Sequence, residues 1–101
     1  MIYFTQLIYI VEGQESVFDQ FESIALPAIA RYNGQLLLRI RPTAESFVEL
    51  HLPPPYELHL VSFENESDFT SFTQDAERQR FLHLKEQSIR EAWLIKGQRI
   101  A

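Results

Sequence analysis

The most constraining feature of the chain is an amino-terminal segment that is apolar on both of its predicted faces. Residues 2–11 are rich in β-branched and aromatic residues, which is typical of a β-strand. A strand with one solvated face alternates apolar with polar side chains, but both alternating sets are mainly apolar here. The segment is therefore predicted to be a central strand that is covered on both faces.

The rest of the chain predicts two helical regions and three more strands. Apolar residues at helical spacing from 17 to 32 predict a helix that bends or restarts at Pro27 and ends at Asn33-Gly34. Asn65 and Asp75 are expected to cap further helical segments. The predicted strands are 35–41, 57–63 and 92–96. The order β-α-β-β-α-β predicts an α+β ferredoxin-like fold, a four-stranded antiparallel sheet with its helices on one face.

Composition removes several classes of protein. With 101 residues, the chain is expected to form a single domain, residues 1–101. It contains no cysteine, which excludes disulfides and thiolate metal sites, and its net charge of −5 is the wrong sign for a general nucleic-acid binder. No apolar run approaches the length of a membrane span, and the start lacks the features of a signal peptide. A cytoplasmic protein that binds neither membrane nor nucleic acid is expected.

The pattern leaves one face of the predicted sheet uncovered. Two helical regions cover one face, yet the first strand is apolar on both, and no further element remains in the chain to cover the second. Because burial of apolar surface is favourable by about 25 cal/mol per Å², a second copy of the chain is the expected cover. The sequence therefore predicts a homodimer whose sheets pack face to face, with an ordinary, mildly apolar surface as the alternative.

Parts of the sequence resemble a known superfamily. The residues that carry the resemblance are 26–38, 56–63, 68–72 and 94–97. They are similar to the dimeric α/β-barrel (ferredoxin-like) superfamily, and most closely to its domain-of-unknown-function 1330 type. The resemblance implies the ferredoxin-like fold and a dimer. The superfamily includes cofactor-independent monooxygenases and lactone isomerases, but no catalytic motif of these enzymes matches the sequence, so no catalytic residue is carried over.

A near-repeat of Glu-Leu-His-Leu offers candidate metal ligands. The candidates are Glu49, His51, Glu57 and His59, because carboxylate and imidazole groups are ligands for zinc or iron. If the two copies form a hairpin with 51 opposite 57 and 49 opposite 59, all four side chains share a face, and a slip of one residue separates the histidines. The alternative, a set of Glu–His polar pairs on a solvated face, is the favoured interpretation, so no metal is predicted.

Two arginines and one histidine form a second candidate group. Arg39 and Arg41 share a face with Leu37, opposite Leu36, Leu38 and Ile40, and His59 lies on the strand expected beside them. The arginines could bind the carboxylate or phosphate of a ligand, or they could pair with Glu49, Glu57 or acidic residues of a partner chain at a sheet edge. His59 is the candidate catalytic acid or base, because imidazole titrates near neutral pH.

Aromatic residues of the first and last strands form a third group. Tyr3, Tyr9 and Trp93 are expected side by side, and they could line a ligand pocket between sheet and helices or simply pack in a core or interface. The charged segments 77–80 and 85–86 are expected to be solvated helix surface. The sequence has no glycine-rich phosphate loop and no nucleophile elbow, so no cofactor is predicted.

Three functions remain open on these observations. The first is a homodimeric protein that binds a small, partly apolar molecule between sheet and helices. The second is a cofactor-independent monooxygenase or isomerase that acts on a small aromatic or lactone-like compound, with His59 as acid or base and Arg39 holding an anionic group. The third is a structural or interaction module that uses the proline-rich segment 43–56, which is expected to form an extra strand or an arm.

Overall fold

The computed structural model describes all 101 residues. The strands are β1 (Ile2–Ile10), β2 (Gly34–Ile40), β3 (Glu57–Phe63) and β4 (Ile89–Gly97). The helices are α1 (Glu15–Arg31), α2 (Glu66–Thr73), α3 (Ala76–Arg80) and α4 (Leu82–Ser88), with a 3-10 turn, η1 (Ala44–Ser46), between β2 and β3. None of these helices has the length and apolar character needed to span a bilayer.

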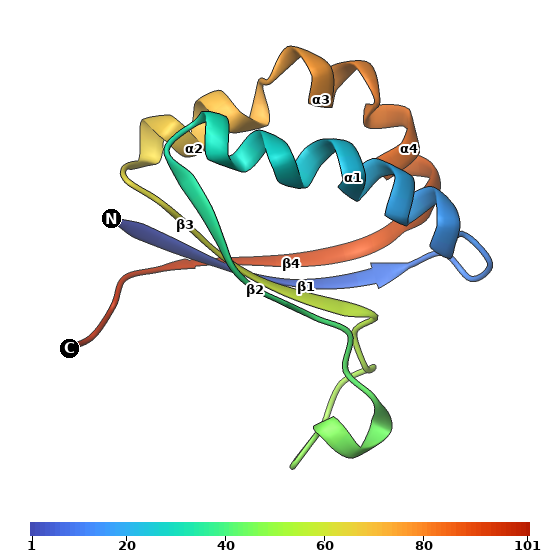
Figure 1. Cartoon of the computed structure of the whole chain (residues 1–101). Helices are drawn as coiled ribbons and strands as arrows, with labels where there is room; N and C mark the ends of the chain where they lie inside the picture. The colour runs from blue at the N-terminus through green and yellow to red at the C-terminus, as the bar shows by residue number, and fades with distance from the viewer.

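The four strands form one antiparallel sheet in the order β2-β3-β1-β4. The helices form a single layer on one face of this sheet, and no element covers the other face (Figure 1). This arrangement confirms the predicted α+β, ferredoxin-like fold. It also confirms that β1 is a central strand, since β1 pairs with β3 on one side and with β4 on the other.

Local signals in the sequence set the ends of the helices. Asn33 has a φ of 57°, so it ends α1 in the left-handed conformation that asparagine tolerates. Gly34 follows because a Cβ there would lie 2.6 Å from the Phe63 ring. The side chains of Asn65 and Asp75 accept backbone N–H bonds at the starts of α2 and α3, as predicted. Pro27 lies inside α1, which continues through it as one helix.

The core lies between the helix layer and the sheet. Phe4, Ile29, Val61 and Phe63 form one buried cluster, against which the rings of α2 pack. A second cluster joins α1 to α4 through Phe21, Ala25 and Leu84. The space between these two clusters is not filled by apolar side chains alone, and the candidate site lies there.

An irregularity in β2 changes which of its residues face the helices. Leu36 pairs with Val61, but Leu38 pairs with Leu60, so one additional residue of β2 is accommodated between the two pairs. The alternation shifts after this point. The prediction that Leu36, Leu38 and Ile40 share a face is therefore wrong, because Leu38 and Ile40 turn to the side without helices. Arg39 and Arg41 turn to the helix side with Leu36.

The helix-free face of the sheet is strongly apolar. Residues that are opposite one another in antiparallel strands have side chains on the same face, so the strand pairing shows which residues lie on the helix-free face. The apolar side chains of the helix-free face are those of Tyr3, Leu7, Leu38, Ile40, Leu58, Leu60, Trp93 and Ile95, and the polar Thr5 and Ser62 lie on the same face. Four of them, Leu38, Ile40, Trp93 and Ile95, are 43–50% exposed. An apolar surface of this kind is typical of an interaction site.

Candidate functional site

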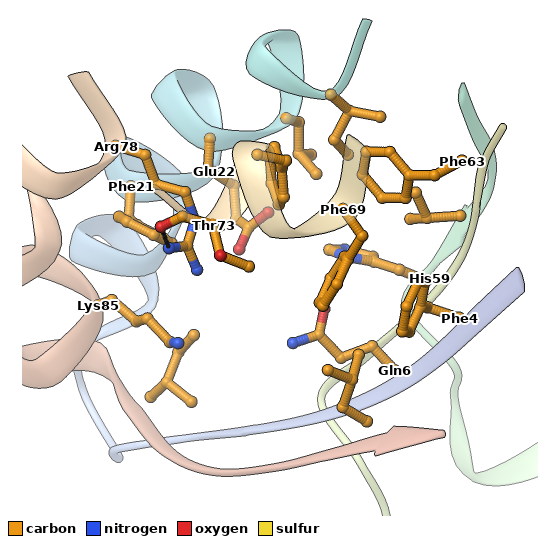
Figure 2. Close-up of a pocket in the computed structure, with 17 residues that line it drawn as sticks. Phe4, Gln6, Phe21, Glu22, His59, Phe63, Phe69, Thr73, Arg78 and Lys85 are labelled. Carbon is orange, nitrogen blue, oxygen red and sulfur yellow. Dashed lines mark hydrogen bonds between the residues drawn. The ribbon is translucent and has the colours of Figure 1, made fainter. Parts of the chain in front are cut away.

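A cavity of about 190 Å³ lies between the sheet and the helix layer (Figure 2). Most of its wall is apolar, with phenylalanines from β1, β3, α1 and α2. The polar side chains that line it are Gln6, Glu22, His59, Thr73, Arg78 and Lys85. An apolar cavity with a few convergent polar groups is the usual form of a small-molecule site.

A hydrogen-bonded pair, Glu57 and His59, forms the sheet side of the site. Both residues belong to β3 and point to the helix side, since residues two apart on a strand share a face. Their side chains are 0% and 2% exposed, and His59 Nε2 lies 2.5 Å from Glu57 Oε2. Arg39 Nε donates to the same oxygen at 3.0 Å, and Arg41 Nε donates to Oε1 at 2.8 Å.

These contacts determine the charge of Glu57. Burial on its own would raise the pKa of this carboxyl, but the hydrogen bonds from His59, Arg39 and Arg41 outweigh it and hold the pKa at about 2. Glu57 is therefore ionised at neutral pH and keeps the His59 ring in a fixed position. Arg41 also contacts Asp19 of α1, which ties the end of β2 to the helix layer.

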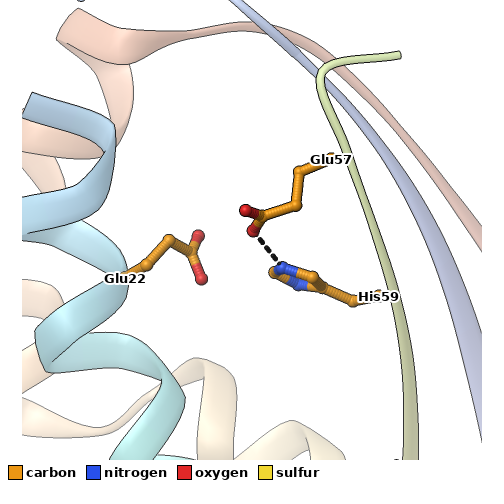
Figure 3. A group of neighbouring side chains, drawn as sticks. All are labelled: Glu22, Glu57 and His59. Atoms are coloured by element: carbon orange, nitrogen blue, oxygen red, sulfur yellow. Dashed lines mark hydrogen bonds and ion pairs between the residues drawn. The ribbon is translucent and has the colours of Figure 1, made fainter. Parts of the chain in front are cut away.

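Glu22 of α1 faces this pair across the site (Figure 3). One carboxylate oxygen of Glu22, one of Glu57 and one ring nitrogen of His59 lie within 4.8 Å of one another. The residue is 5% exposed, yet its side chain forms no hydrogen bond and no ion pair. Burial raises the pKa of Glu22 to about 7, because the nearby charge of His59 only partly offsets the loss of solvation. Glu22 therefore exchanges its proton close to neutral pH.

Two cationic side chains reach the same cavity from the helix layer. Arg78 of α3 lies over the rings of Phe21 and Phe72, with the guanidinium carbon 5.9 and 5.3 Å from the ring centres. Lys85 comes from α4 (Figure 2). Burial lowers the pKa of both side chains, and the nearby Glu22 opposes this effect. Neither cation forms an ion pair with a carboxylate of the chain.

The donor set suits proton transfer better than metal binding. Glu22, Glu57 and His59 are close enough to consider as metal ligands. Both Glu57 oxygens, however, already accept hydrogen bonds from arginines. Glu22 and one imidazole nitrogen remain, which is fewer than the three or four protein ligands of a zinc site. A buried carboxyl that titrates near pH 7 beside an oriented imidazole is instead typical of general acid–base chemistry.

The structure brings together some of the predicted site residues. His59, the predicted acid or base, lines the cavity. Arg39 and Arg41 contact Glu57, which is the ion-pair alternative considered for them, and neither lines the cavity. They line a separate, open pocket with Ile40 and Glu57, so an anionic ligand held by these arginines stays a prediction.

The structure places the other predicted residues away from the cavity. Tyr3 and Trp93 occupy odd positions of β1 and β4 and lie on the helix-free face, so the expected pocket between sheet and helices does not include them. Glu49 and His51 lie between β2 and β3 in a connection that contains no strand, and the middle of this connection extends away from the helices (Figure 1). The hairpin that a four-ligand metal site would need is absent, and Glu49 and His51 form only a local contact of 3.0 Å on the surface.

Glu22, Arg78 and Lys85 were not predicted as site residues. A signal for Glu22 is present in the sequence, because position 22 falls within the apolar stripe of α1, between Phe18 and Ala25 at helical spacing. The sequence predicts solvated surface for Arg78 and Lys85. Both side chains are instead partly buried and line the cavity, Arg78 from α3 and Lys85 from α4.

The fold is similar to those of several solved proteins, although no protein-family model and no curated protein matches the sequence. The chain is an α+β protein of the ferredoxin-like fold. The narrower resemblance to the domain-of-unknown-function 1330 type is not confirmed.

Three solved proteins illustrate the likeness. The RPA0582 protein of unknown function from Rhodopseudomonas palustris has a TM-score of 0.76 at 12% identity, over 99% of this chain and 82% of that one. A protein from Nitrosomonas europaea, whose proposed function is antibiotic biosynthesis monooxygenase, has a TM-score of 0.73 at 8% sequence identity over 100% of both chains. A dimeric ferredoxin-like protein of unknown function from Jannaschia sp. CCS1 has a TM-score of 0.70 at 14% sequence identity, over 97% of this chain and 98% of that one.

Proposed function

We propose that the protein binds a small, partly apolar molecule in the cavity between sheet and helices and catalyses proton transfer on it without a cofactor. Glu22 takes a proton from the substrate, and His59, held by Glu57, faces the same atoms. The observation that carries this proposal is the Glu22 carboxyl, which is buried, has no partner in the chain and points into the cavity (Figures 2 and 3).

An isomerisation balances with these groups alone. The ionised Glu22 carboxylate takes a proton from a carbon next to a carbonyl, which leaves an enolate and a neutral carboxylic acid. The acid then returns the proton to a different carbon, and both substrate and enzyme recover their charge. A pKa near 7 suits both steps, since each form of the carboxyl is populated at neutral pH. A cofactor-free monooxygenase would begin with the same proton removal and would need dioxygen as a second substrate.

Exchange of substrate hydrogen for deuterium tests the proposal directly. Acetophenone and α-angelica lactone are suitable probes, since both carry an acidic C–H next to a carbonyl. In deuterated water the wild type is expected to accelerate loss of the C–H signal in proton NMR spectra. Glu22→Gln keeps the shape of the side chain and removes the base, so the rate is expected to fall by about 10²-fold or more.

A matched control lies on the same helix. Glu15 is an exposed residue in the first turn of α1, and Glu15→Gln is expected to leave the exchange rate unchanged. If Glu22→Gln exchanges as fast as the wild type, Glu22 is not the base. If the wild type does not exceed the buffer rate with either probe, the acid–base part of the proposal is wrong.

We also propose that the protein is a homodimer formed through its helix-free face. The apolar side chains on this face come from all four strands, and several are about half exposed in the single chain. A second copy would present the same surface and bury both. Tyr3 and Trp93 then act as interface residues, which is one of the two roles expected for them. The neighbour from Jannaschia that is described as dimeric has the same fold.

Substitution at the centre of this face tests the dimer. Leu60 lies between Thr5 and Leu38 in the middle of the sheet. Leu60→Lys would place an unpaired charge in the interface, so its dissociation constant is expected to rise by at least about 10²-fold. Light scattering should give twice the 11.9 kDa chain mass for the wild type. Ile100→Lys, at an exposed terminal residue, should remain dimeric. A wild type with the mass of one chain at micromolar concentration contradicts the proposal.

A further inference from the structure

We infer that Arg78 and Lys85 form an anion subsite in the cavity, which selects ligands that combine an aromatic ring with a carboxylate. This inference rests on the proposed function and adds the substrate class to it.

The first observation is an imbalance of charge within the cavity. Arg78 and Lys85 both line it, and neither has a carboxylate of the chain within ion-pair distance. The other cations near the site, Arg39 and Arg41, have Glu57 as their partner. Glu22 is the one acid on the cavity wall, so the helix side of the cavity has more positive than negative groups. Two partly buried cations without a counter-ion favour the binding of an anion.

The second observation is that the guanidinium group of Arg78 is not satisfied by the chain. One terminal nitrogen donates to the backbone oxygen of Thr73 at 3.2 Å. Its Nε is buried and has no hydrogen-bond partner. A buried donor without an acceptor is costly, and a carboxylate that binds the guanidinium through two parallel bonds would remove this cost.

The apolar part of the cavity determines what the anion is attached to. Phe4, Phe63 and Phe69 lie on the side opposite Arg78 and Lys85, with Phe4 and Phe69 stacked at a centroid separation of 4.0 Å (Figure 2). Since a dry cavity of about 150 Å³ is large enough to bind benzene, the cavity of about 190 Å³ can hold one ring with a small substituent. An aromatic monocarboxylate matches the size of the cavity, its apolar side lined by phenylalanines and its cationic side at Arg78 and Lys85.

Benzoate and benzamide separate charge from shape, since the two probes are nearly the same size. Titrations followed by nitrogen–proton NMR spectra at pH 6 keep Glu22 mostly neutral, so it does not repel the anion. The wild type is expected to bind benzoate about tenfold or more tightly than benzamide. Arg78→Met and Lys85→Met each keep the apolar part of the side chain and should remove most of this preference. Arg80→Met, at an exposed position of the same helix α3, should keep it.

The outcomes separate the inference from the proposed function. If benzamide binds as tightly as benzoate, or if both Met variants keep the preference, the anion subsite is overturned while the cavity remains a binding site. If neither probe shifts the NMR signals of the residues that line the cavity, the proposed binding function is overturned along with the subsite. Two variants are used so that a failure of one to fold leaves the other as the test.

Discussion

Replacement of Glu57 by glutamine is expected to lower the free energy of unfolding by about 3–5 kcal/mol, the cost of breaking a buried ion pair by removing one partner. The Glu57 side chain is 0% exposed and accepts from Arg39, Arg41 and His59. Glutamine keeps one acceptor oxygen, but its amide group turns a donor toward the donors around it. The arginines are 36% and 44% exposed and can turn to water, whereas His59 stays buried, so the lower end of the range is expected.

Urea denaturation at pH 7 measures this cost. Glu66→Gln is the matched control, since Glu66 and Lys96 form an ion pair in which both side chains are more than half exposed. Loss of an exposed pair of this kind costs less than about 1 kcal/mol. If Glu57→Gln costs no more than Glu66→Gln, Glu57 does not stabilise the junction of β2 and β3, and its role as the support of His59 is wrong.

The fold follows from features that are local in the sequence. The two apolar faces of β1, the caps at Asn65 and Asp75 and the stop at Asn33 each depend on a few neighbouring residues, and these predictions are confirmed. The irregularity in β2 could not be predicted in this way. It depends on how β2 aligns with β3, which no residue within β2 specifies, and it moves Arg39 and Arg41 relative to Leu38.

The site is less accessible to prediction because it combines residues from distant elements. His59 could be identified, since histidine on a central strand is chemically distinctive. Glu22 becomes important only once α1 is placed over β3, and Arg78 only once α3 is placed beside the same cavity. The sequence leaves both a pocket role and a packing role open for Tyr3 and Trp93, because alternation defines two faces without saying which of them the helices cover.

Glu22→Gln is expected to stabilise the protein above pH 7, although the same variant removes the proposed base. In the unfolded chain Glu22 ionises near its ordinary pKa of 4.5, whereas burial raises the pKa in the folded chain to about 7. Between these pH values the folded state holds the additional proton, so the free energy of unfolding falls as the pH rises. Above pH 7 the decrease is complete, and ionisation of Glu22 has then lowered the free energy of unfolding by about 3 kcal/mol.

Comparison of the variant with the wild type isolates this contribution. The other charged groups around Glu22 are Glu57, His59 and Arg39 on the sheet side and Arg78 and Lys85 on the helix side. All of them are present in both proteins, so their own titrations largely cancel in the difference. Urea denaturation is expected to give similar stabilities at pH 4, with glutamine the more stable by about 3 kcal/mol at pH 8. An equal difference at both pH values would show that Glu22 titrates normally.

The sign of this effect distinguishes a chemical role for Glu22 from a structural one. A carboxyl that supports the fold, as Glu57 does, has a lowered pKa and is costly to replace. Glu22 has a raised pKa and no partner in the chain, so its ionised form opposes folding at neutral pH. A variant that gains stability and loses deuterium exchange would show that the same carboxyl destabilises the fold and moves the proton. A variant that loses both would instead place Glu22 among the residues that hold the core together.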